Sequence, residues 1–78
     1  MNEPLVKRDI IVNGNQIVFP RRSISFEEVA DLAGYSEPTI TYRFKGAATL
    51  GQGILAQGDV LLLPYEITIF NAVPTGDA

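Results

Sequence analysis

The sequence contains no histidine and no cysteine. Without cysteine the chain has no disulfide, no thiol nucleophile and no thiolate metal ligand. Without histidine it lacks the commonest general base and metal ligand of proteins. These two absences exclude most enzyme chemistries, so we expect a protein that is not an enzyme and that binds no cofactor or metal.

Positive charge is also scarce. The chain has 6 Lys and Arg residues against 9 Asp and Glu, a formal net charge of -3, and the basic residues form no stripe that a phosphate backbone would attract. No apolar run approaches the roughly 18 residues of a membrane span, and the N-terminal residues lack the apolar region of a secretory signal. We therefore expect a cytoplasmic protein that binds neither nucleic acid nor membrane.

The length of 78 residues allows one small domain. The apolar fraction of 46% suits a folded core. Residues 1–7 include a proline and several polar groups, and we interpret them as an N-terminal leader. The predicted domain covers residues 8–73, and residues 74–78 form a C-terminal tail.

A β-hairpin is predicted at the start of the domain. Apolar residues are concentrated at about 8–12 and 16–19, on either side of Asn13 and Gly14, which tolerate the positive φ of a tight turn. Pro20 lacks a backbone N–H and should end the second strand.

One helix is predicted after the hairpin. Ser25 and Glu28 have the spacing of a capping box, and Gly34 can take the left-handed conformation that ends a helix. The apolar residues between them recur at intervals of three and four and predict one buried stripe. This stripe consists of Phe26, Val29, Ala30, Leu32 and Ala33.

The second half of the chain favours strands. Period-two alternation over 39–45 predicts a half-buried strand, and a brief strand or turn is expected near Ile54 after a glycine-rich loop. Residues 60–63 and 66–73 should form a final strand pair. The order β-β-α-β-β-β predicts an α+β fold of the β-grasp type, a mixed four- to five-stranded sheet with one helix on one face.

The sheet face opposite the helix should be open to solvent. Alternation turns Ile11 outward, and one member of each pair at 61/62 and 69/70 must also turn outward. The exposed apolar residues are either ordinary surface or a docking patch. The candidate partner-interface residues are Ile11, Val18, Leu62 and Phe70. A sheet edge near residues 47–58 could also accept a partner strand.

Four segments together resemble a known family. They are DIIVNG at 9–14, ISFEEVADLA at 24–33, TITY at 39–42 and IFN at 69–71. They are similar to the bacterial multiubiquitin-type domain, a ubiquitin-like β-grasp module, over about residues 8–73. The resemblance implies a protein modifier of a bacterial conjugation system linked to phage defence. The partners that it implies are ubiquitin-activating-like and conjugating-like enzymes, a deconjugating peptidase and target proteins.

The tail differs from that of ubiquitin because AVPTGDA at 72–78 has no Gly-Gly end. Glycine is favoured at such an end because it allows close backbone approach in an adenylating site. Removal of Asp77 and Ala78 would expose Gly76, the candidate conjugation terminus. Direct use of Ala78, a cut nearer Asn71 and an ordinary frayed terminus are the alternatives.

Two other functions fit the same residues. The domain could act without conjugation, by binding other proteins or by assembling with itself into an oligomer or filament through the open face. Sulfur-carrier proteins also begin with a Val-Asn-Gly hairpin and a helix, but they need the terminal Gly-Gly that this chain lacks. Conjugation through the trimmed tail is the function that we expect.

Overall fold

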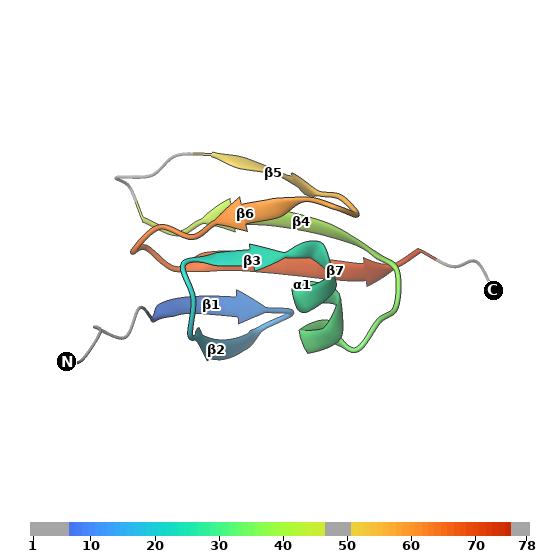
Figure 1. Cartoon of the computed structure of the whole chain (residues 1–78), viewed down its shortest axis with the longest axis horizontal. Helices are drawn as coiled ribbons and strands as arrows, with labels where there is room; N and C mark the ends of the chain where they lie inside the picture. The colour runs from blue at the N-terminus through green and yellow to red at the C-terminus, as the bar shows by residue number, and fades with distance from the viewer. Residues whose placement is uncertain (1–6, 47–50, 76–78) are drawn as a thin grey trace.

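The computed structural model describes residues 7–46 and 51–75. Figure 1 shows a large sheet with a short helix and a small two-stranded sheet layered on one side of it. The elements are β1 (Arg8–Val12), β2 (Asn15–Phe19), β3 (Ser23–Ser25), α1 (Phe26–Ala33), β4 (Pro38–Phe44), β5 (Gln52–Leu55), β6 (Val60–Leu62) and β7 (Thr68–Pro74). The expected α+β class is confirmed.

The large sheet has five strands in the order β2-β1-β7-β4-β5. β1 and β7 pair in parallel, and the other neighbours pair antiparallel. The sheet is therefore mixed, as predicted, and its arrangement with one helix is compatible with a β-grasp. The last strand of the chain lies at the centre, directly beside the first.

Two short strands do not follow the sequence prediction. Residues 60–63 were expected to pair with the final strand, but β6 pairs instead with β3 in a separate two-stranded sheet. Ile24 of β3 is fully buried, and Leu61 of β6 packs against the same core. The small sheet thus covers the part of the core that the eight-residue helix is too short to cover.

The core lies between the large sheet and the layer formed by α1, β3 and β6. Phe26, Val29 and Ala30 are the buried residues of the helix. Leu32 is 43% exposed, so its assignment to the buried stripe was wrong. It lies about a third of a turn from the centre of the stripe. The buried core consists of Ile10, Val12, Phe19, Ile24, Phe26, Val29, Ala30, Ile40, Leu55, Leu63, Phe70 and Ala72.

Both ends of α1 follow the sequence signals. The Ser25 hydroxyl accepts from the Glu28 N–H at 3.1 Å, the Glu28 carboxylate accepts from the Ser25 N–H at 2.9 Å, and Gly34 ends the helix with φ of 85°. Arg21 forms an ion pair with Glu28. Partial burial acts to raise the pKa of Glu28, but the Ser25 N–H and the Arg21 guanidinium outweigh it and lower the pKa. These interactions therefore stabilise the fold above roughly pH 4.3 and are lost as the pH falls through the lowered pKa.

Asn13 joins the hairpin turn to the central strand. Asn13 and Gly14 both have positive φ, 51° and 87°, as the predicted turn requires. The Asn13 side-chain Nδ2 donates to the Ala72 carbonyl at 3.0 Å, and its Oδ1 accepts from the Ala72 N–H at 2.8 Å. The side-chain amide thus continues the β1–β7 ladder by one more pair of hydrogen bonds.

The substitution Asn13→Asp should destabilise the domain by about 1–3 kcal/mol. The new side chain would keep an acceptor for the Ala72 N–H but would set a carboxylate against the Ala72 carbonyl. Urea denaturation followed by circular dichroism measures the loss. The matched control is Asn15→Asp, which makes the same charge change at a position that is exposed like Asn13 but does not bond to Ala72, and it should stay within about 0.5 kcal/mol of wild type. Equal losses in the two variants would contradict this role for Asn13.

Candidate functional site

The face of the large sheet opposite α1 has no covering layer among residues 7–46 and 51–75. Cross-strand partners share a face, so the strand register identifies the side chains that lie on it. We call this surface the open face. Its apolar residues are Ile11, Val18, Ile54, Ile69 and Val73, and its polar residues are Asp9, Gln16, Thr39, Thr41, Arg43, Gln52 and Asn71.

Apolar side chains lie on four of the five strands of this face. Ile11 and Ile69 are aligned in the parallel ladder, and both are half-buried. Ile54, on the edge strand β5, is 68% exposed. Exposed apolar side chains set among polar groups are typical of surfaces that bind other proteins.

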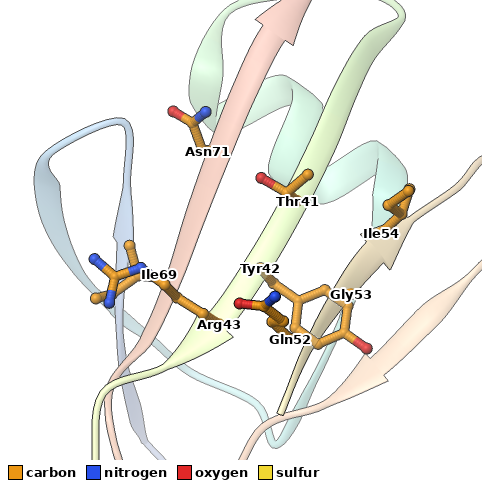
Figure 2. Close-up of a pocket in the computed structure, with 8 residues that line it drawn as sticks. All are labelled: Thr41, Tyr42, Arg43, Gln52, Gly53, Ile54, Ile69 and Asn71. Atoms are coloured by element: carbon orange, nitrogen blue, oxygen red, sulfur yellow. The ribbon is translucent and has the colours of Figure 1, made fainter.

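A shallow hollow of about 370 Å³ lies on the open face over β7, β4 and β5. Figure 2 shows Ile69 and Ile54 on opposite sides of it, with Thr41 between them and the Arg43 side chain extending toward Ile69. The lining thus combines two branched apolar side chains with a hydroxyl and a guanidinium. Such a lining can hold an apolar side chain and donate hydrogen bonds to the backbone around it, as binding of a polypeptide requires.

Gly53 of β5 also lines the hollow, and its lack of a side chain matters on the other face of the sheet. A Cβ atom at this position would lie 2.8 Å from the Tyr42 hydroxyl oxygen. Tyr42 is the partner of Gly53 in the β4–β5 ladder and packs against the core. The glycine therefore lets the Tyr42 ring lie across the edge strand.

The structure brings two of the four predicted interface residues together on the open face. Ile11 and Val18 point to this face from β1 and β2. Phe70 was placed there wrongly: it is 1% exposed and aligned with the buried Val12, so the outward member of the pair is Ile69. Alternation requires one of the two to turn outward, but only the β1–β7 register decides which.

Leu62 lies apart from the other predicted interface residues. It is 72% exposed, as an interface residue should be. However, it belongs to β6, which pairs with β3 in the small sheet on the helix side of the molecule. Its placement beside Ile11 on one face was wrong because the sequence did not predict β3, the strand that β6 joins.

Three residues that line the hollow were not predicted from the sequence as interface residues. They are Arg43, Gln52 and Ile54. The alternation over 39–45 was a usable signal for Arg43, since it put Thr41 and Arg43 on the polar side of that strand. Gln52 fell within the expected loop, and Ile54 was given only a brief strand or turn. Because no strand was predicted to pair with β4 at these positions, neither Gln52 nor Ile54 could be assigned to a face of the sheet.

The candidate conjugation residues Gly76 and Ala78 lie outside the described residues. The described chain leaves the sheet at the end of β7, where Pro74 pairs with Pro38 and the Thr75 hydroxyl donates to the Glu37 carbonyl at 2.7 Å. A cut near Asn71 would remove the buried Ala72 and the pairs that follow it. The geometry therefore disfavours that alternative for a folded domain.

Three comparisons with known proteins were made: no family model, no curated protein and no solved structure matches the chain. Within the described ranges, no helix is long and apolar enough to cross a membrane. The same ranges contain no cluster of three acidic residues placed to hold a metal ion. The features of the described residues that bear on function are the open face and the point where the chain leaves β7.

A charged residue should distinguish the two faces of β7. Phe70→Asp places a carboxylate in the core and should destabilise the domain by more than about 3 kcal/mol. Ile69→Asp places it on the open face and should cost about 1 kcal/mol. Urea denaturation of the two variants, compared with wild type, measures both values. A folded Phe70→Asp variant beside an unfolded Ile69→Asp variant would reverse the assignment of the faces.

Proposed function

We propose that this chain is a ubiquitin-like protein modifier of a bacterial conjugation system, attached to target proteins through its C-terminal tail. The chain is not itself an enzyme; activating-like and conjugating-like enzymes and a trimming peptidase act on it. Four segments resemble the multiubiquitin-type domain, and a mixed sheet with adjacent first and last strands is compatible with its β-grasp fold. The resemblance also supports a role in phage defence.

The position of the tail carries this proposal. Within residues 51–75, the last buried residue is Ala72, the last ladder pair joins Pro74 to Pro38, and Thr75 is exposed. Residues beyond Thr75 can therefore be trimmed, extended into an enzyme or joined to a target while every described core residue is kept. A modifier needs this separation, because its tail must enter an active site while its domain stays folded.

The chemistry belongs to the partner enzymes. The tail carboxylate attacks the α-phosphate of ATP and displaces pyrophosphate, which gives an acyl adenylate. A nucleophile of the partner or target then attacks the acyl carbon and displaces AMP. Gly76 is the proposed terminus because a glycine allows the backbone to approach the adenylating site closely.

The open face supports a second candidate function, noncovalent protein binding. Ile54 is 68% exposed beside the hollow of about 370 Å³. The same surface could recruit the partner enzymes of a modifier, so the two functions are compatible. They differ in their dependence on the tail, because only covalent transfer needs a free carboxylate.

Truncation of the tail tests the proposal. An N-terminally tagged chain that ends at Gly76, expressed with its partner enzymes but without the peptidase, should form adducts that survive a denaturing gel. A chain that ends at Thr75 keeps the whole described domain and is the matched control; it should form none. Adducts of the chain that ends at Thr75 would contradict use of Gly76. So would the absence of adducts from both truncated chains and from the full chain expressed with the peptidase. Capture of the same proteins by both truncated forms would favour noncovalent binding.

A further inference from the structure

The outer edge of β5 is a surface distinct from the open face. β5 is the last strand in the order of the large sheet, and β4 is its neighbour on the inner side. Figure 1 shows β5 at the rim of the sheet. On its outer side, the described residues provide no backbone hydrogen-bond partner. Half of the N–H and C=O groups of this strand thus point away from the fold.

This edge lacks the features that normally prevent strand pairing. Natural sheet edges are blunted by lysine, by proline or by a β-bulge. The segment GQGILAQG at 51–58 contains no charged residue and no proline, and the β4–β5 register runs without a bulge from Ile40 opposite Leu55 to Arg43 opposite Gln52. No side chain within 51–58 therefore opposes another strand. The nearest charged group along the chain is Asp59, whose carboxylate accepts from the Ala56 N–H just beyond β5, and the Tyr42 ring lies over Gly53 on the helix side.

The opposite edge of the same sheet is different. β2 is followed at once by Pro20, Arg21 and Arg22. The Arg21 guanidinium lies 5.0 Å from the centre of the Phe19 ring, at the end of β2. Arg21 itself turns toward α1, where it forms the ion pair with Glu28. The difference between the two edges is therefore the proline that directly follows β2, since no proline follows β5 before Pro64.

We propose that the β5 edge pairs antiparallel with the β5 edge of a second copy of this chain, about a two-fold axis normal to the sheet. Such pairing is self-complementary, since each copy presents the same strand to the other. It would join two five-stranded sheets into one. The pairing does not depend on conjugation and goes beyond the proposed function.

The alternation of side chains limits the possible registers of this pairing. Partners across the axis must share a face, so Ile54 lies opposite either itself or Gln52 of the second copy. Both side chains are uncharged, and both lie on the open face. A second copy is favoured over a charged peptide because residues 51–58 offer no ion pair, while two chains of net charge -3 can approach through an uncharged segment.

The contact is small. Two four-residue strands bury less than the roughly 1,200 Å² at which stable interfaces begin. The expected assembly is therefore a weak dimer that forms as the protein concentration rises. An edge of this kind can align two open faces without a permanent complex.

Sedimentation equilibrium of the full chain over a dilution series tests the proposal. Wild type should shift from monomer to dimer as its concentration rises into the millimolar range. Ile54→Lys places two like charges at the axis or beside it, in either register, and should weaken the dimer at least roughly tenfold. Thr41→Lys is the matched control, because Thr41 lies directly opposite Ile54 on the same face but on an interior strand. It should leave the dimer within about twofold of wild type.

Hydrogen exchange gives a second measurement that does not depend on variants. The outward amides of residues 52–55 should exchange more slowly in concentrated than in dilute wild-type protein. A wild-type chain that stays monomeric at millimolar concentration would overturn the proposal. If Ile54→Lys and Thr41→Lys weakened the dimer equally, the copies would contact each other through the open face and the proposal would be wrong. A dimer of Ile54→Lys as stable as that of wild type would also overturn the proposal.

Discussion

The parallel pairing of β1 with β7 is the interaction on which the rest of the structure depends. It places the last strand at the centre of the sheet, and its register aligns Ile11 with Ile69 and Val12 with Phe70. That register decides which side chains face α1 and which face solvent on every strand of the sheet. Asn13 lengthens the same pairing through its side-chain amide. One long-range contact thus defines both the core and the open face.

The proposed function follows from this central position of β7. β7 contributes Phe70 and Ala72 to the core. Its Ile69 and Asn71 lie on the open face, and the tail begins where this strand ends. A partner could therefore bind the open face while an enzyme holds the residues beyond Thr75. Neither interaction needs a catalytic side chain on this chain. In the proposed function the domain provides a folded surface and the carboxylate of its tail, and partner enzymes provide the catalysis.

The sequence predicted the elements whose signals are local. The Asn13-Gly14 turn, the capping box of Ser25 and Glu28, and the end of the helix at Gly34 all depend on neighbouring residues, and the structure confirms them. The predictions were wrong where the position of a strand depends on pairing with residues far away in the sequence. β3 and β6 are three residues each, too short for a periodic pattern, and their pairing moved Leu62 off the predicted face. Phe70 was misplaced because alternation alone does not give the register of β7.

In the proposed function the C-terminal tail becomes covalently joined to other proteins. The most direct measurement is a denaturing gel of the N-terminally tagged chain, expressed in its own host with its neighbouring genes intact, followed by mass spectrometry of the heavier bands. The account predicts adducts whose junction peptide ends at Gly76 of this chain and carries an amide bond to a target residue. A single band of 8.5 kDa plus the tag, under inducing stress and with all partner enzymes present, would contradict covalent attachment.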